Sequence, residues 1–491
     1  MKLRIVVKAS PNKDTQSFIK IARYHQFDYH MVALVDSQIS EWINQKNKLY
    51  IDNLKVIRIT KAHYVSLIDK LPNLETLKVS LTVKRGVHDV YEYKHINWRT
   101  LFPRKKVIDF ECSYTETPPF YIQEFTMVYQ FNKVILRNGL LKIDKIESLS
   151  SLSPSSTMIT VLQIMSLQID YQVIESLIKK SPNLKKLELI DVNSPIDYNI
   201  NNQLIDLLLQ QPLSSLVKLN FINRTLAVQF SSLIMLYNRL KVTEMHSFFP
   251  KFVFDTRKDL SKFKIENSTI QHTSFYSSSD VDEPNFNHNL LVNWTDFKNL
   301  NSILYRDSKL KYLSGIISQN LYNLSTITIQ PNIGEIKVDM QDILDSLKFN
   351  YYLTTLDFYY LDFNHLDEFL TSNHPTIVNL MVSIVETKNC DNISQKIITA
   401  IKSNSNLLKL SIRDFTEIRG YFFDLMVMGI YENGHQIRYL SIPCSSLSKS
   451  FKIDSFEEIL MNNPHITYLN GCKTPNTEYK RLLNKYSVMP I

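Results

Sequence analysis

The stretch Ser176 to Asp191, SLIKKSPNLKKLELID, constrains the fold most, because near-copies of it recur along almost the whole chain. Four apolar residues at its start share one stripe of a helix: Val173, Ile174, Leu177 and Ile178. Pro182 ends this helix, and Leu184, Leu187 and Leu189 follow with the alternation of a half-buried strand. A helix and a strand that are each apolar on one side cannot bury those sides alone, so the pattern predicts stacked units.

The repeats can be aligned on the middle apolar residue of each predicted strand, here called the anchor. The clear anchors are Leu77, Leu187, Leu219, Leu356, Leu380, Leu410, Leu440 and Leu469. Weaker copies place anchors at Ile57, Val107, Val134, Leu162, Thr243, Phe263, Ile303 and Ile327. The last four steps between clear anchors are 24, 30, 30 and 29 residues. The pattern predicts about sixteen units with a mean spacing of about 27 residues.

A helix followed by PNL-x-x-L-x-L at this period resembles the leucine-rich-repeat superfamily, in particular its ribonuclease-inhibitor-like and F-box-associated branch. The resemblance covers roughly residues 50 to 472. It implies an α/β solenoid with a curved parallel sheet on the concave side and helices on the convex side. The Asn and Cys that usually close the turn after the strand are mostly missing, although Cys444 and Cys472 lie near the Cys position. We therefore expect irregular repeats.

The composition predicts a globular protein with a large core, since 44% of the residues are hydrophobic and 21% are charged. Length alone favours several domains, but a solenoid can continue as one body. We expect a solenoid over residues 51–472, with loop insertions near 83–99 and 266–289, the second of them mobile. Residues 473–491 are predicted to form a C-terminal cap, because Tyr479, Leu482 and Leu483 have helical spacing. We interpret the abundance of Asn, Ile, Lys and Tyr as compositional background.

Residues 15 to 48 do not follow the repeat and are predicted to form two or three short helices. The segment VALVDSQISEWINQK resembles the second half of an F-box, but the L-P-x-E-I-L pattern of the first half is missing. Two interpretations of residues 1–50 are open. They form a helical cap on the first repeat, or a degenerate F-box that would bind a cullin-ligase adaptor.

The sequence contains no signal for export or for a membrane span, because the run Ile5 to Val7 is too short and no later run reaches about 18 apolar residues. We expect a cytoplasmic protein, with the nucleus as the alternative. Its four cysteines form no metal-binding spacing and are interpreted as buried free thiols: Cys112, Cys390, Cys444 and Cys472.

Motifs of catalysis are missing from the sequence. There is no phosphate-binding glycine loop among its eight glycines, and no GxSxG or HExxH motif. The neighbouring acids Asp367 and Glu368 point in different directions on a helix, as do Glu457 and Glu458, so neither pair forms an acid/base couple. We expect no catalytic residue, no cofactor and no metal.

Charge along the predicted strands indicates candidate contacts. The residue before the anchor is a lysine in six repeats, and this row is interrupted by Val161 and Val242: Lys106, Lys133, Lys186, Lys218, Lys262 and Lys409. Strands lie about 4.8 Å apart and salt screens charges over about 8 Å, so neighbouring ammonium groups would reinforce one another. The row is either a basic track for an acidic partner or a solvated face neutralised by Glu188, Glu244 and Asp357.

Tyr439 and Tyr468 continue the same row and form a second candidate contact, because exposed tyrosines are frequent in interfaces. The leading hypothesis is a non-catalytic scaffold that binds a protein partner on its concave face. A sharper version is a substrate receptor in ubiquitin ligation. The alternative hypothesis is RNA binding by the basic track.

Overall fold

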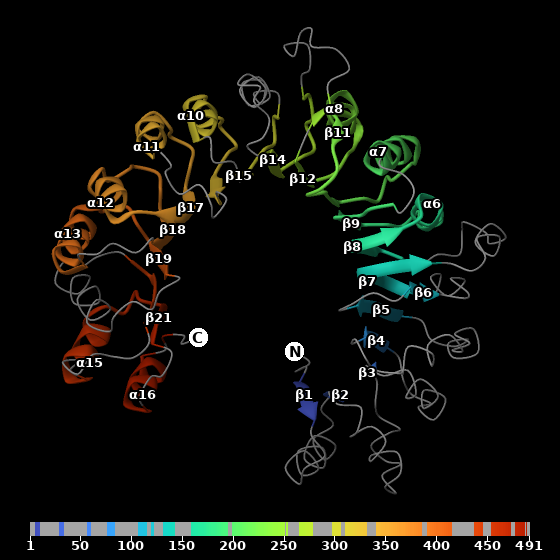
Figure 1. Cartoon of the computed structure of the whole chain (residues 1–491). Helices are drawn as coiled ribbons and strands as arrows, with labels where there is room; N and C mark the ends of the chain where they lie inside the picture. Colours follow the sequence, from blue (N-terminus) through green and yellow to red (C-terminus); the bar gives the residue numbers. More distant parts are fainter. Residues whose placement is uncertain are drawn as a thin grey trace, which may run out of the picture. The chain divides into compact units, whose positions relative to one another are not determined.

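The computed structural model describes the following residues: 5–9, 29–33, 56–59, 76–83, 107–114, 119–121, 131–142, 159–194, 199–250, 252–253, 265–277, 297–305, 310–330, 340–384, 390–414, 437–444, 453–472, 477–486 and 488. The chain divides into two compact units, unit 1 from Met1 to Asp255 and unit 2 from Thr256 to Ile491. Both combine parallel strands with helices, as the sequence predicts (Figure 1).

Unit 1 is built on a parallel sheet whose later strands alternate with helices. Its strands are β1 (Ile5–Ala9), β2 (Tyr29–Ala33), β3 (Val56–Ile59), β4 (Thr76–Val83), β5 (Val107–Tyr114), β6 (Pro119–Tyr121), β7 (Phe131–Lys142), β8 (Val161–Ile169), β9 (Lys186–Ile190), β10 (Lys218–Ile222), β11 (Val228–Gln229), β12 (Glu244–Phe249) and β13 (Phe252–Val253). Its described helices are α6 (Tyr171–Lys179), α7 (Ile200–Gln210) and α8 (Phe230–Arg239). Strands β3, β4, β5, β7, β8, β9, β10 and β12 pair in parallel in that order.

Unit 2 repeats the same order more regularly. Its strands are β14 (His272–Ser277), β15 (Ser302–Tyr305), β16 (Thr326–Ile329), β17 (Thr355–Leu361), β18 (Asn379–Ile384), β19 (Lys409–Asp414), β20 (Tyr439–Cys444) and β21 (Tyr468–Cys472). Its described helices are α10 (Leu310–Ser318), α11 (Gln341–Leu347), α12 (Phe363–Thr371), α13 (Cys390–Ser403), α15 (Ile453–Asn462) and α16 (Thr477–Lys485). Each strand pairs in parallel with the next, and the helices lie on one side of the sheet (Figure 1). The strand face away from the helices is called the open face.

The strand register confirms most of the predicted anchors. In unit 2 each of these residues stands opposite the next: Ile303, Ile327, Leu356, Leu380, Leu410, Leu440 and Leu469. In unit 1 the run is Val134, Leu162, Leu187 and Leu219. All of them are buried, so the leucine pattern correctly identifies the core side of each strand.

Two weak anchors are wrong. Ile108, not Val107, stands opposite Leu77, and an irregularity between β5 and β7 then shifts the register. Met245, not Thr243, stands opposite Leu219, because Met245 and Phe249 supply the apolar side of β12. The anchor predicted at Phe263 lies outside the described residues.

Helix α6 confirms the pattern from which the repeat was derived. Val173, Ile174, Leu177 and Ile178 are its buried residues, and the helix ends at Lys179, before Pro182. Burying an aliphatic side chain stabilises the fold by roughly 1.5–3 kcal/mol, which is why the apolar stripe must face the sheet.

Buried polar side chains connect successive repeats of unit 2 at the turns between helix and strand. The Nδ2 of Asn350 donates to the carbonyl of Ile317 at the end of α10 (3.0 Å), and that of Asn404 donates to Leu370 in α12 (3.1 Å). In the repeat between them, His374 Nε2 lies 2.8 Å from the Leu347 carbonyl at the end of α11. These contacts satisfy carbonyls that a helix end leaves without intrahelical partners. We call these three residues the turn ladder.

Each member of the turn ladder also organises its own turn. Asn350 Oδ1 accepts hydrogen bonds from the backbone N–H groups of Tyr352 (3.0 Å) and Leu353 (2.9 Å). Asn404 Oδ1 accepts from Asn406 and Leu407 in the same way. One side chain therefore fixes the turn and joins it to the preceding helix, and it excludes water while doing so.

The ends of the chain differ from the predictions in part. Met31 to Ala33 belong to β2, which pairs in parallel with β1, so the helical prediction is wrong for these residues. The strand period thus begins before residue 50, and the remainder of segment 15–48 lies outside the described residues. Residues 477–485 form α16 with Tyr479, Leu482 and Leu483 buried, as predicted.

The predicted mobile insertion at 266–289 is wrong for its first half. Residues 272–277 form β14, and Thr273 stands opposite the anchor Ile303. Just before it, the buried Asn267 accepts hydrogen bonds from the backbone of Thr269 and Ile270, which orders the turn. Residues 278–289 and the insertion at 84–99 lie outside the described residues. In the described part of the chain, no helix combines the length and apolar character needed to cross a membrane.

Candidate partner-binding site

The open face of unit 1 carries part of the predicted lysine row. Lys186 stands opposite Val161 on one side and Lys218 on the other, and Lys133 stands opposite Val161. The next residue in the row is Glu244, which stands opposite Lys218. Val242 was predicted at this position of the row. Lys106 and Lys262 lie outside the described residues. Because Val107 stands opposite Thr76, position 107 rather than 106 holds the row in β5.

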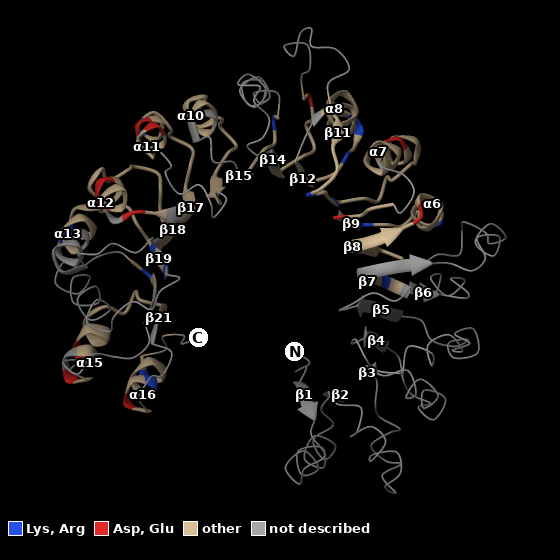
Figure 2. Ribbon diagram, in the orientation of Figure 1, with Lys and Arg blue, Asp and Glu red and all other residues tan. Residues whose placement is uncertain are grey.

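Acidic side chains neutralise the two central lysines of this row. Lys186 Nζ lies 3.0 Å from Glu188 Oε1, and Lys218 Nζ lies 2.5 Å from Glu244 Oε2. The buried Glu188 also accepts hydrogen bonds from the amides of Gln163 and Asn220. Basic and acidic residues accordingly alternate around β9 (Figure 2). The local charge of this part of the row is balanced, as the alternative interpretation of a neutralised strand face expects.

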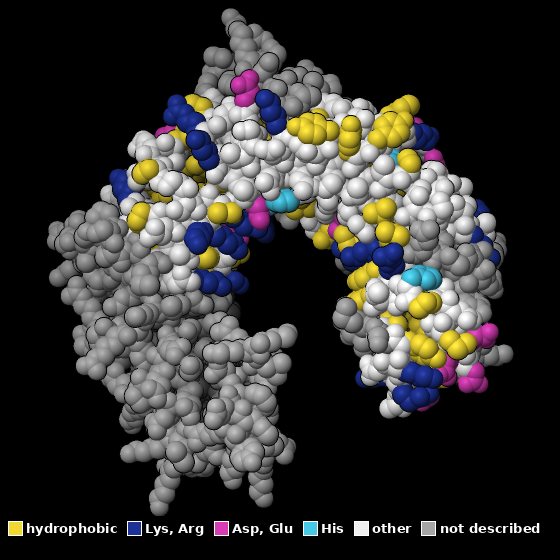
Figure 3. Space-filling view, turned by 180° about the vertical axis from the view of Figure 1, so that it is seen from behind, with side chains coloured by type: hydrophobic (Ala, Val, Ile, Leu, Met, Phe, Trp, Pro, Cys, Tyr) yellow, Lys and Arg dark blue, Asp and Glu magenta, His cyan; other side chains and the backbone are white. Residues whose placement is uncertain are grey.

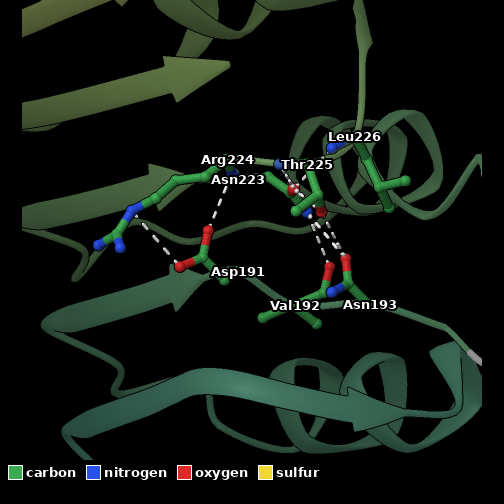
Figure 4. Close-up of polar contacts among 7 residues, drawn as sticks. All are labelled: Asp191, Val192, Asn193, Asn223, Arg224, Thr225 and Leu226. Carbon is green, nitrogen blue, oxygen red and sulfur yellow. Dashed lines mark hydrogen bonds and ion pairs between the residues drawn. The ribbon is translucent and has the colours of Figure 1, made fainter. Parts of the chain in front are cut away.

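The loops after β9 and β10 form a second polar cluster in unit 1 (Figure 4). Asn223 Nδ2 donates to the Val192 carbonyl (2.9 Å), and Asn223 Oδ1 accepts from the N–H groups of Thr225 (3.0 Å) and Leu226 (2.9 Å). Asp191 Oδ1 accepts from the N–H of Arg224 (2.8 Å). Asn223 is buried and its hydrogen-bonding groups are used, so this cluster holds the loops together and offers no free site.

The first outward row of unit 2 changes in character along the sheet. Its residues are His272, Ser302, Thr326, Thr355, Asn379, Lys409, Tyr439 and Tyr468. In the early strands, His272 Nδ1 and Ser302 Oγ lie 2.7 Å apart, and Asn379 donates to Thr355 (3.0 Å). Neighbouring side chains therefore satisfy one another there. The last three strands instead present a cation and two aromatic rings.

Lys409, Tyr439 and Tyr468 form a continuous stack across β19, β20 and β21. The Lys409 ammonium lies 4.3 Å from the centroid of the Tyr439 ring. The Tyr439 and Tyr468 rings are parallel within 4°, with centroids 3.8 Å apart. Cation–π and stacked aromatic contacts each contribute about 0.5–1.5 kcal/mol, so the three side chains hold one another in place. The structure thus brings both predicted tyrosines together, with Lys409 beside them. The prediction that both are exposed is wrong for Tyr468, which is buried.

A second cation–aromatic contact lies nearby on the same face. Arg413, four residues after Lys409 on β19, reaches across β18 to the carboxylate of Asp357 on β17. Its guanidinium also lies 4.8 Å from the centroid of the Tyr359 ring. Burial raises the pKa of Asp357, and the charge and hydrogen bond of Arg413 offset part of that rise. This ion pair is not apparent from the sequence, because 56 residues separate its partners.

We expect Tyr468→Phe to leave the free energy of unfolding at pH 7 unchanged, or to raise it by about 1 kcal/mol. The Tyr468 hydroxyl is buried and makes no hydrogen bond with the described residues, and an unsatisfied buried polar group costs about 1–3 kcal/mol. The control is Tyr237→Phe, which removes a buried hydroxyl that contacts Ser247 Oγ at 2.7 Å and should destabilise the fold. Urea unfolding of both variants measures the difference, and equal losses would contradict this assignment.

Tyr468→Phe should also change how the free energy of unfolding depends on pH in alkaline solution. Burial first, and then the neighbouring Tyr439, raise the pKa of Tyr468 from 10.0 to about 12. Between these pH values the unfolded chain loses the proton that the folded chain keeps. The free energy of unfolding therefore falls as pH rises from 10 towards 12, and Tyr468→Phe should reduce this fall.

An exposed aromatic cluster on unit 2 was not predicted. Tyr322, Phe349, Tyr351 and Tyr352 lie in the turns before β16 and β17, with 63%, 66%, 59% and 45% of their surface exposed. Figure 3 shows hydrophobic side chains on the outer surface of the described part of the molecule. Tyr322 and Tyr351 occupy the position five residues before the anchor, where Pro182, Pro375 and Pro464 stand in other repeats. This equivalence is visible in the sequence once the anchors are aligned.

Among the described residues, no three His, Cys, Asp or Glu side chains are grouped so that they could hold a metal ion.

The strongest candidate site is the open face of β17 to β21, because it carries the stacked tyrosines and two cations. No protein-family model matches the chain, and no curated protein matches it.

Proposed function

We propose that the chain is a non-catalytic protein-recognition scaffold of the leucine-rich-repeat type, which binds its partner on the open face of unit 2. The repeat type is supported by leucine anchors that stand opposite one another at steps of 24, 30, 30 and 29 residues. The observation that carries the function is the stack of Lys409, Tyr439 and Tyr468. Tyr439 is partly exposed, and the buried Tyr468 holds its ring in place from below the surface. A tyrosine that is already ordered loses little conformational freedom on binding, which favours it as an interface residue.

The lysine row of unit 1 is a weaker candidate for the contact. Lys186 and Lys218 are each paired with a glutamate, so a partner would have to break an ion pair to use them. The alternative function, RNA binding by this row, loses support for the same reason. Phosphate groups bind to lysines that are not already paired with a carboxylate, because the binding releases counterions.

A substrate-receptor role in ubiquitin ligation remains a narrower form of this proposal. It requires the N-terminal segment to bind an adaptor as a helical F-box does. The parallel strands β1 and β2 count against it, since they form a two-stranded sheet in place of helices. Removing residues 1–49 is the direct test, because loss of a cullin-ligase adaptor from the captured proteins would support the receptor role.

The proposed function is tested by quantitative affinity capture with the full chain and with Tyr439→Thr. Threonine is the residue that this row already carries at Thr326 and Thr355, so the strand should tolerate it. The matched control is Tyr351→Thr, a tyrosine on the exposed turn of the same unit. We expect a defined set of proteins to be lost with Tyr439→Thr and retained with Tyr351→Thr. Equal recovery with all three chains would contradict the proposal.

A further inference from the structure

We infer that the partner contacts this face with an acidic, extended protein segment. The inference rests on the proposed function and adds the chemistry of the partner. It starts from the ionic side chains that the described residues place on the open face of β17 to β21, which are two cations, Lys409 and Arg413, and one carboxylate, Asp357.

The single carboxylate is already committed. Asp357 is buried and bound by Arg413, so it offers little to a cationic partner. Lys409 forms no ion pair with a described residue, and its ammonium is held in place over the Tyr439 ring. Arg413 is bound to Asp357 through one nitrogen of its guanidinium, yet its side chain keeps 36% of its surface exposed. The face therefore presents an excess of positive charge and of hydrogen-bond donors, which an anionic ligand complements.

The spacing of the two cations limits the shape of that ligand. Lys409 and Arg413 are four residues apart on one strand, so both side chains leave the same face of the sheet. At a rise of about 3.3 Å per residue their Cα atoms are separated by about 13 Å. An extended peptide that follows β19 would match them with carboxylates four residues apart.

The aromatic rings favour a protein segment over a nucleic acid. A base stacks on the open face of a ring, as in many single-strand binding proteins. The Tyr439 ring is covered by Lys409 on one face and by Tyr468 on the other, and Arg413 lies against the Tyr359 ring. Tyr468 is itself only 8% exposed. The rings of Tyr439 and Tyr468 are therefore not available as stacking platforms, whereas Tyr439, Lys409 and Arg413 are partly exposed and can contact side chains of a peptide.

The test is selection of a random 12-residue peptide library on the immobilised full chain, followed by affinity measurement of the selected peptides. We expect enrichment of Asp and Glu, with pairs four residues apart. Affinity should fall about fivefold or more with Lys409→Gln and with added salt, since a charge-assisted contact is lost in both cases. The matched control is Lys480→Gln, which removes an exposed lysine from α16 and should not change the affinity.

The possible results separate this inference from the proposed function. Selected peptides that lack acidic residues but need Tyr439 would overturn the inference and leave the proposed function standing. Peptides whose binding is unchanged by both Lys409→Gln and Tyr439→Thr would overturn both. A library that yields no binder, or a 20-nucleotide uridine RNA that binds through Lys409 at the same salt, would also overturn the inference.

Discussion

Replacing Asn350 with alanine is expected to destabilise unit 2 by about 3–5 kcal/mol. The substitution leaves two backbone N–H groups, those of Tyr352 and Leu353, without their acceptor. It also removes one of two donors to the Ile317 carbonyl, which keeps the N–H of Asn320. Each unsatisfied buried group costs about 1–3 kcal/mol, and local relaxation recovers part of the sum. Asn350 is fully buried, so water does not replace the lost bonds without rearrangement of the turn.

Hydrogen exchange of the native chain measures this effect where it arises. The amides of residues 341–356 should exchange much faster in Asn350→Ala, while those of α6 and β9 in unit 1 keep their protection. The control is Asn364→Ala, which changes an exposed asparagine on α12 of the same unit and should shift stability by less than about 0.5 kcal/mol. Similar exchange in the two variants would show that the turn ladder contributes little.

The turn ladder also shows what sequence analysis missed. The abundance of asparagine was interpreted as compositional background, and this is wrong for Asn223, Asn267, Asn350 and Asn404, all of which are buried and organise a turn. Asn350, His374 and Asn404 each stand six residues before their anchor. The position is therefore regular, but the hydrogen bonds to the preceding helix depend on how closely two repeats pack, which a linear pattern does not contain.

The leucine anchors were predictable for a simple physical reason. A strand with one buried face has a side-chain period of two, so Leu380, Leu410 and Leu440 identify both the face and the register. In β12 the apolar side is built from Met245 and Phe249 instead, and the predicted anchor was displaced by two residues. A shift of two keeps each side chain on its face but changes its neighbours. Glu244 therefore moved into the lysine row, where it pairs with Lys218.

The candidate site was predictable only in part. Tyr439 and Tyr468 were identified from their place in the row, because register alone brings them together. The ion pair of Asp357 and Arg413 spans three strands and depends on the reach of a long side chain. Such a contact depends on the rotamer of the arginine and on the size of the side chains that it passes over on the middle strand. Hydrophobic periodicity predicts neither of them.

His374 makes the turn ladder sensitive to acid, and we expect His374→Asn to remove that sensitivity. The Nε2 of His374 donates to the Leu347 carbonyl at 2.8 Å, while Nδ1 faces the Thr376 N–H at 3.4 Å. This arrangement needs the neutral ring. Burial lowers the pKa of His374 below 6.5, and hydrogen bonds with the backbone of Leu347 and Asn350 offset only part of that effect.

The direction of the pH dependence follows from this shift. As pH falls below about 6.5, the unfolded chain takes up a proton that the folded chain does not, so the free energy of unfolding decreases until the lower folded pKa is reached. At pH 7.5, His374→Ala should destabilise unit 2 by about 1–3 kcal/mol, because it leaves the Thr376 N–H without its acceptor and the Leu347 carbonyl with the Asn350 N–H as its remaining donor. Asparagine serves the same position in two neighbouring repeats, so His374→Asn should remain within about 1 kcal/mol of the natural chain at pH 7.5.

Urea unfolding at pH 7.5 and pH 5.5 distinguishes these expectations. The natural chain should lose more stability between the two pH values than His374→Asn, since both carry the same remaining titratable groups and differ only at this position. The control is His365→Asn on α12, which replaces a partly buried imidazole that lies 2.6 Å from the carboxylate of Asp362 and is not part of the turn ladder. If His374→Asn lost as much stability at pH 5.5 as the natural chain, protonation of His374 would not be the cause of the acid sensitivity. The buried ring would then have a purely steric role.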